Sequence, residues 1–201
     1  MTRLAMRLHD ELTMKIEAAG DRWLIGSAAR LVFAATLLFY FWNSARTKIG
    51  EGFFGFFSIS DNAYYQIALP AVEAAGGDVS QVPFLPWGLM VWAGTYAEFI
   101  LPFLIVVGLA TRIAALGMIC FVIVQSAVDI FVHQVGAETT GALFDRFSDG
   151  LIADQRLFWA FLFTILVVKG AGALSLDAII LKRTAAPARG AAGSSRIAQI
   201  S

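Results

Sequence analysis

Four long apolar stretches constrain this chain more than any other feature. They cover residues 23–45, 84–110, 113–132 and 157 to about 176. Each reaches the roughly 20 residues that an α-helix needs to cross about 30 Å of hydrocarbon. Because backbone amides and carbonyls cannot stay unpaired in lipid, each stretch is predicted to be helical. The composition agrees, since a soluble domain has no room to bury a chain that is 58% hydrophobic and 15% charged. The predicted fold is an all-α integral membrane four-helix bundle.

The chain divides into three predicted parts. Residues 1–22 form a cytoplasmic, partly helical segment, 23–181 the four-helix transmembrane domain, and 182–201 a basic disordered cytoplasmic tail. Acidic residues near the start, and the length of the apolar run that follows, argue against a cleavable signal. Only Thr111 and Arg112 separate the second and third stretches, so these two helices must be antiparallel neighbours. The longer connections are predicted to be polar loops with short helices, for example over residues 62–75.

Lysine and arginine are distributed unevenly between the two sides of the predicted bundle. The cytoplasmic side of a multi-pass protein carries the excess of these residues, so both termini are predicted to be cytoplasmic. The side of the termini has nine of them (Arg3, Arg7, Lys15, Arg22, Arg112, Lys182, Arg183, Arg189 and Arg196) and the opposite side four (Arg46, Lys48, Arg146 and Arg156).

Net charge and cysteine content limit the classes of partner and site. The formal net charge is zero, so nucleic acid is not expected as a partner, whereas the lipid bilayer is. Cys120 is the single cysteine, so one chain can form neither a disulfide nor a cluster of thiolate ligands. The chain has two histidines, and no third ligand stands at a known spacing, so no metal site is predicted. No residue set predicts a bound cofactor.

Ionisable residues inside the apolar stretches are the first candidates for a functional site. Such groups cost about 2.5 to 3.5 kcal/mol on insertion scales, so they normally face the bundle interior beside a partner. Arg30, Glu98 and Lys169 fall at overlapping depths on three helices. We therefore expect Glu98 to pair with Arg30 or Lys169. Two interpretations stay open, a buried pair that only fixes helix packing and a site with a chemical role.

A second polar group lies on the third stretch. Gln125, Asp129 and His133 recur every four residues, which predicts one polar stripe that rises towards the outer surface. An aspartate and a histidine one turn apart can relay a proton or bind a metal ion. The alternative is a stripe that faces a water-filled vestibule or the loop above it.

Two sequence runs resemble the DoxX family. After Glu98, residues 108–115 read Gly-Leu-Ala-Thr-Arg-Ile-Ala-Ala, similar to the family's Gly-Leu-x-Thr-Arg-x-Ala-Ala. Residues 169–177 read Lys-Gly-Ala-Gly-Ala-Leu-Ser-Leu-Asp, similar to its Gly-Pro-Gly-x-x-Ser-Leu-Asp, with Ala171 in place of the proline. Arg30 and Lys48 are similar to an arginine and a lysine of the family, although the first external loop is longer than is typical. The family-motif residues of this chain are Thr111, Arg112, Gly170, Gly172, Ser175 and Asp177.

The resemblance implies a four-helix bundle in the bacterial inner (plasma) membrane. Some relatives are small membrane subunits of quinone-linked oxidoreductases, and others are grouped with oxidative-stress or metal-handling proteins. We therefore expect an accessory subunit that anchors a membrane redox assembly or supplies it with a quinone-accessible site. Quinone is the candidate ligand and a redox protein the candidate partner, while the sequence leaves open whether the chain is itself an enzyme.

Two other functions stay open. One is a small-solute transporter or export helper, in which Arg30, Glu98 and Lys169 line a polar path through a homo-oligomer. The other is a non-catalytic membrane scaffold for a partner protein.

Overall fold

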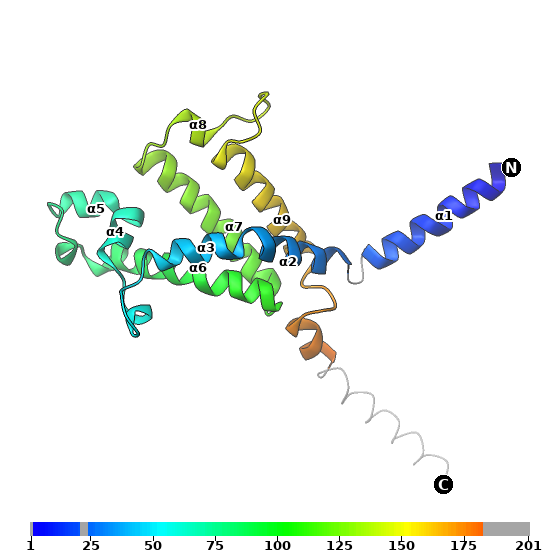
Figure 1. The fold of residues 1–201 in the computed structure, drawn as a ribbon, viewed down its shortest axis with the longest axis horizontal. Helices are drawn as coiled ribbons and strands as arrows, with labels where there is room; N and C mark the ends of the chain where they lie inside the picture. The colour runs from blue at the N-terminus through cyan, green and yellow to red at the C-terminus, as the bar shows by residue number, and fades with distance from the viewer. Residues whose placement is uncertain (1, 21–23, 183–201) are drawn as a thin grey trace, which may run out of the picture.

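The computed structural model describes residues 2–20 and 24–182, which form helices and connecting loops (Figure 1). No β-strand occurs in these two ranges, and the prediction of an all-α protein is confirmed. Trp23 and most of the predicted C-terminal tail, residues 183–201, lie outside the described residues.

Four helical units match the four apolar stretches. Three are long and apolar enough to cross a membrane as continuous spans, and the remaining one is a pair of helices bent by 42° that reaches this length only when the two helices are counted as one span. The bent pair is α2 (Ile25–Thr36) and α3 (Leu38–Arg46); the others are η4 (Phe84–Gly88) with α6 (Leu89–Val107), α7 (Thr111–Ala127) with η5 (Val128–Val132), and η6 (Leu151–Gln155) with α9 (Arg156–Lys169).

The fourth span begins and ends earlier than predicted. It runs over Leu151–Lys169 rather than from residue 157 to about 176. Its first turn was missed because Asp154 and Arg156 interrupt the apolar pattern, yet Arg156 is buried. It ends where Gly170 adopts a positive φ of 76°, a conformation that suits glycine and stops an α-helix. A loop follows, and the chain is helical again over residues 176–182.

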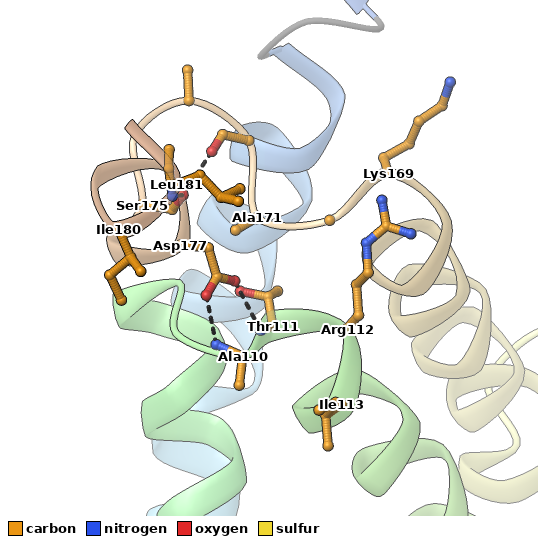
Figure 2. Close-up of a pocket in the computed structure, with 14 residues that line it drawn as sticks. Ala110, Thr111, Arg112, Ile113, Lys169, Ala171, Ser175, Asp177, Ile180 and Leu181 are labelled. Carbon is orange, nitrogen blue, oxygen red and sulfur yellow. Dashed lines mark hydrogen bonds between the residues drawn. The ribbon is translucent and has the colours of Figure 1, made fainter. Parts of the chain in front are cut away.

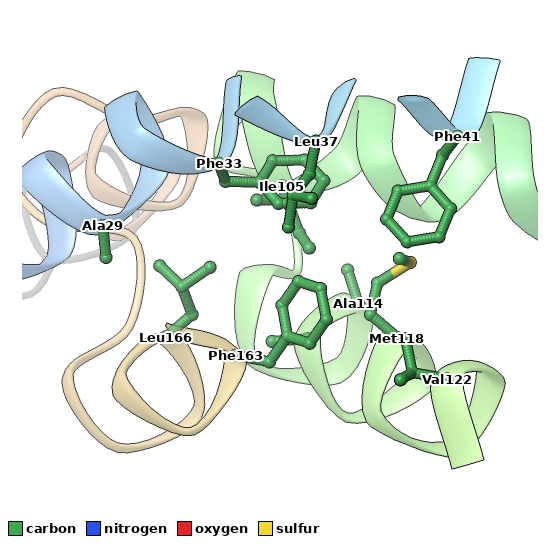
Figure 3. Close-up of a cluster of buried hydrophobic side chains, with 11 residues drawn as sticks. Ala29, Phe33, Leu37, Phe41, Ile105, Ala114, Met118, Val122, Phe163 and Leu166 are labelled. Atoms are coloured by element: carbon green, nitrogen blue, oxygen red, sulfur yellow. The ribbon is translucent and has the colours of Figure 1, made fainter. Parts of the chain in front are cut away.

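The buried core lies where the bent span, α6, α7 and α9 meet (Figure 3). Phe33, Phe41, Met118 and Phe163 are fully buried there, and the ring centroids of Phe33 and Phe163 are 5.8 Å apart. Many apolar side chains of the spans point outward instead, such as Ile113, which is 73% exposed. So large an apolar outer surface is stable in contact with lipid rather than with water.

Residues before the first span form α1 (Thr2–Ala19), as the prediction of a partly helical segment requires. Its apolar residues Leu4, Leu8, Leu12 and Ile16 recur every four positions, and all are exposed. The cytoplasmic location of this segment stays a prediction.

The connection between the first two spans is more ordered and more apolar than expected. The helix predicted over residues 62–75 is present as two helices, α4 (Asp61–Ile67) and α5 (Leu69–Ala74), which pack on α6. Proline at the start of α5 accounts for the division, because it cannot donate the amide that would continue α4. Ahead of them, η2 (Gly55–Phe57) brings Phe56 against Tyr96 and Phe99 of α6. Two further short helices, η3 (Val79–Gln81) and α8 (Ala137–Thr140), complete the loops.

Candidate functional site

Glu98 of α6 forms a buried ion pair with Lys48, which follows α3. The Lys48 Nζ atom donates to both carboxylate oxygens, at 3.1 and 2.9 Å. It also donates to the Ser44 hydroxyl at 2.7 Å and to the Ser44 carbonyl at 3.2 Å. The two charged side chains are only 5% and 4% exposed. Each charge therefore has its partner, and the ammonium group has enough acceptors for its three protons, which is what allows a buried pair to persist.

The prediction that Glu98 pairs with Arg30 or Lys169 is wrong. The charge count places Lys48 among the four basic residues on the side opposite to the termini, but its side chain folds back by one helical turn to Ser44. In addition, α6 extends well beyond the end of α3, so that Trp42 in the last turns of α3 donates to the carbonyl of Phe99, at 3.3 Å. The end of the first span thus lies level with the middle of the second. A depth in the membrane that is counted along each helix separately cannot reveal how far α3 and α6 are shifted relative to each other.

Arg30 of α2 binds backbone carbonyls at the opposite end of the bundle. Its Nε donates to Ile105 at 2.8 Å and its Nη1 to Ala171 at 3.0 Å, and the guanidinium also donates to the carbonyls of Val106 and Leu174. Ile105 and Val106 belong to the last turn of α6, whose carbonyls lack partners within the helix. A cation at this position also interacts favourably with the negative end of the helix dipole. Arg30 therefore holds α6 to the loop after α9.

Asp177 caps the start of α7 from the same end. Its carboxylate accepts the amides of Ala110 at 2.8 Å and Thr111 at 3.1 Å (Figure 2). Its own amide donates to the carbonyl of Gly108 at 2.8 Å. Free amides at a helix start favour an acidic partner. Asp177 therefore ties the segment after the fourth span to the turn between α6 and α7.

The remaining family-motif residues shape the same turn. The Ser175 hydroxyl donates to the Gly172 carbonyl at 2.7 Å and accepts the Ala178 amide at 3.1 Å. Gly108 has a φ of 71°, and a Cβ atom there would lie 2.5 Å from the Cβ of Ser175. Only glycine fits this position without a shift of its neighbours. The structure thus gathers Thr111, Gly170, Gly172, Ser175 and Asp177 in one structural cap, beside which Arg112 and Lys169 border a cavity.

A second cavity, of about 480 Å³, lies beside the Glu98–Lys48 pair, and we name it the α6–α7 cavity after the helices that supply most of its wall. Its wall is mainly apolar. Glu98 and Lys48 border it, and so do all three residues of the predicted stripe, Gln125, Asp129 and His133. The structure therefore brings the buried carboxylate and the stripe together.

The three residues of the stripe differ in whether their side chains already have hydrogen-bond partners. Asp129 accepts from Arg156 at 2.6 Å. His133 donates through Nε2 to the carbonyl of Gln66, at 2.9 Å. Gln125 makes only a long contact of 3.5 Å to the hydroxyl of Tyr40, and its buried Oε1 accepts no hydrogen bond from the described residues. Gln125 is thus the member of the stripe with hydrogen-bonding capacity to spare.

The sequence did not predict that Lys48 and Arg156 pair with acids inside the bundle. Both count among the basic residues on the side opposite to the termini, and only the family resemblance singles out Lys48. Arg156 is buried and also donates to the Ser126 hydroxyl, at 3.0 Å. A usable signal existed, because a long basic side chain near the end of a span can reach inward to a buried acid.

Arg30, Glu98 and Lys169 do not border one common path. Glu98 lines the α6–α7 cavity, Lys169 lines the cavity at the other end, and Arg30 is engaged with backbone carbonyls. Within one protomer the three residues therefore do not share a cavity, and a polar path through a homo-oligomer stays a prediction. Among the described residues, no three His, Cys, Asp or Glu side chains are grouped so that they could hold a metal ion.

Comparison with known proteins gives one match. A family model described as DoxX matches residues 26–134, which is more than half of the chain and includes Arg30, Lys48, Glu98 and the stripe. No curated protein and no solved structure matches the chain.

Proposed function

The chain belongs to the DoxX family of multi-pass membrane proteins, and we propose that it is an accessory subunit whose α6–α7 cavity takes the headgroup of a quinone for a membrane redox assembly. The observation that carries this proposal is the combination of a mainly apolar cavity of about 480 Å³ with polar side chains grouped on part of its wall. This volume lies within the range of about 300 to 1,000 Å³ that is usual for small-molecule sites.

A quinone headgroup matches this distribution of surfaces. Its ring and isoprenoid tail are apolar, and its two carbonyl oxygens need hydrogen-bond donors. The amide of Gln125 supplies a donor through Nε2, and its Oε1 accepts a hydroxyl proton once the quinone is reduced to quinol. Gln125 is therefore the residue that orients the headgroup.

Protons and electrons take separate routes in this proposal. Reduction of a quinone takes up two electrons and two protons, and oxidation of the quinol returns them. His133 is exposed and Asp129 is 25% exposed on its side chain, so both can exchange protons between the cavity and water. In this proposal the electrons come from or go to a redox partner protein, which the accessory role assumes.

Binding of a short-chain quinone analogue to the purified full-length protein in detergent, measured by calorimetry, tests the proposal. Gln125→Leu removes one hydrogen-bonding amide and should weaken binding about tenfold, because one hydrogen bond contributes about 1.5 kcal/mol. Gln81→Leu, at an exposed position in η3, is the matched control and should bind like the wild type.

Two results would contradict the proposal. One is a wild-type protein that does not bind the analogue, which would favour a scaffold. The other is equal affinity of the wild type and Gln125→Leu, which would place the ligand elsewhere.

A further inference from the structure

Another cavity lies at the end of the molecule opposite to the α6–α7 cavity. It has a volume of about 650 Å³, and we name it the α7–α9 cavity because the start of α7 and the end of α9 border it (Figure 2). Thr111, Arg112 and Ile113 line it from α7, and Lys169 lines it from α9. Residues of the loop and helical turn after α9 complete the wall. The proposed quinone site uses none of these residues.

Two cations border this cavity. In Figure 2, the side chains of Arg112 and Lys169 extend from neighbouring helix ends in the same direction, away from the bundle. Asp177 is the carboxylate on the wall, and both of its oxygens already accept backbone amides of α7. It also interacts electrostatically with Arg30. The region bordered by Arg112 and Lys169 is therefore suited to an anion.

Thr111 supplies an independent sign of a ligand. Its residue is only 1% exposed, and its hydroxyl Oγ1 is buried without a hydrogen-bond partner among the described residues. A buried hydroxyl that makes no hydrogen bond costs free energy, so such groups normally have a partner. An oxygen-rich ligand in the cavity that Thr111 lines would accept its proton.

The cavity lies at a membrane boundary. Arg112 is the second residue of the span Thr111–Val132, and Lys169 is the last residue of the span Leu151–Lys169, so both cations are at the headgroup level on one side of the bilayer. Next to them, Ile113 and Val168 are 73% and 60% exposed and face lipid. From the membrane surface inward, a cationic surface is thus followed by an apolar one. A phospholipid presents its phosphate and its acyl chains in the same order. This arrangement does not depend on which side is cytoplasmic.

The geometry points to a binding site for an anionic diacyl phospholipid in the α7–α9 cavity. The phosphate lies between Arg112 and Lys169 and accepts hydrogen bonds from both, and one of its oxygens accepts the Thr111 hydroxyl. The acyl chains lie along the outward faces of α7 and α9, beside Ile113 and Val168. Bound in this way, the lipid joins the start of the third span to the end of the fourth.

Native mass spectrometry of the full-length protein, titrated with phosphatidylglycerol or phosphatidylcholine, tests this site. The double variant Arg112→Gln/Lys169→Gln should lose about thirtyfold in affinity for phosphatidylglycerol, which corresponds to about 1 kcal/mol for each basic residue. Affinity for phosphatidylcholine should hardly change. Arg46→Gln/Arg146→Gln removes two exposed cations from the other end of the molecule and serves as the charge-matched control.

Further variants separate charge from folding and lipid from free phosphate. The exchange variant Arg112→Lys/Lys169→Arg keeps both charges and should retain the preference for phosphatidylglycerol. If the double glutamine variant binds phosphatidylglycerol as tightly as the wild type does, the site is refuted. A loss of equal size in the charge-matched control would refute it too, because the attraction would then be nonspecific. If inorganic phosphate displaces phosphatidylglycerol at equal concentration, the site is one for free anions, and the assignment to a lipid is wrong.

Discussion

Arg30 and Glu98 are both ionisable groups within apolar spans, yet the two ends of the bundle satisfy them in different ways. Arg30 binds four backbone carbonyls, and near it Asp177 binds two backbone amides. Glu98 binds the side chain of Lys48, and Asp129 binds that of Arg156, on the wall of a cavity. The charged side chains of Arg30 and Asp177 thus connect backbone segments. Those of Glu98 and Asp129 instead pair with basic side chains beside the α6–α7 cavity.

From this difference we infer a structural role for the contacts of Arg30 and Asp177, and the proposed function concerns the other end. Backbone groups cannot be exchanged by mutation, so no second substitution can replace the contacts that Arg30 and Asp177 make. Side-chain pairs can be replaced by apolar residues of similar size without loss of stability. Stability alone therefore does not account for an ion pair on a cavity wall, and the proposed ligand binding or proton exchange gives such a pair a role.

The largest effect is expected from breaking the Glu98–Lys48 pair on one side only. Glu98→Leu leaves a buried, unpaired ammonium group and should cost about 3 to 5 kcal/mol of unfolding free energy. The double variant Glu98→Leu/Lys48→Met should recover most of that loss, since no unpaired charge remains. Unfolding measured in bicelles provides the four values of this double-mutant cycle. Failure of the double variant to recover would mean that the pair is structural, as the Arg30 contacts are.

Arg30→Met should cost about 3 kcal/mol, the sum of several hydrogen bonds that contribute on the order of 1 kcal/mol each within a membrane. No second substitution should rescue it, because the orphaned acceptors belong to the backbone. Arg30→Lys should recover only a part, as an ammonium group lacks the planar fork that reaches several carbonyls. The same unfolding assay applies, with Lys15→Met on the exposed helix α1 as the control. If Arg30→Met is as stable as the wild type, the backbone contacts of Arg30 do not stabilise the fold, and the contrast with the Glu98–Lys48 pair is lost.

A smaller effect is expected from Asp129→Asn. Its side chain is 25% exposed and lies in the last turn of the span Thr111–Val132, at the boundary where water reaches and screens the pair with Arg156, so the loss should be about 1 kcal/mol. High salt should reduce the difference between variant and wild type, because exposed ion pairs are screened. In the bicelle assay, a loss as large as that of Glu98→Leu would show that Asp129 is as firmly held as Glu98.

Much of the fold follows from local pattern. Apolar runs of sufficient length predicted three continuous spans and the bent pair α2–α3, and the two-residue connection at Thr111 and Arg112 predicted that α6 and α7 are neighbours. Spacing by fours predicted that Gln125, Asp129 and His133 share a face, and all three border one cavity. The bounds of the fourth span could not be predicted in this way, since Arg156 lies inside the bundle through a partner on another helix. The orientation of the termini remains a prediction from charge.

The sequence by itself determined that this chain enters a membrane, because the transfer of an apolar helix into lipid depends on the composition of that segment alone. Only the tertiary structure decided that Glu98 meets Lys48 and that Arg30 meets the end of α6. Those choices depend on the offset between α3 and α6, on the bend in the first span and on how far a flexible side chain reaches. None of these is a property of one segment, because each arises from how the helices pack against one another.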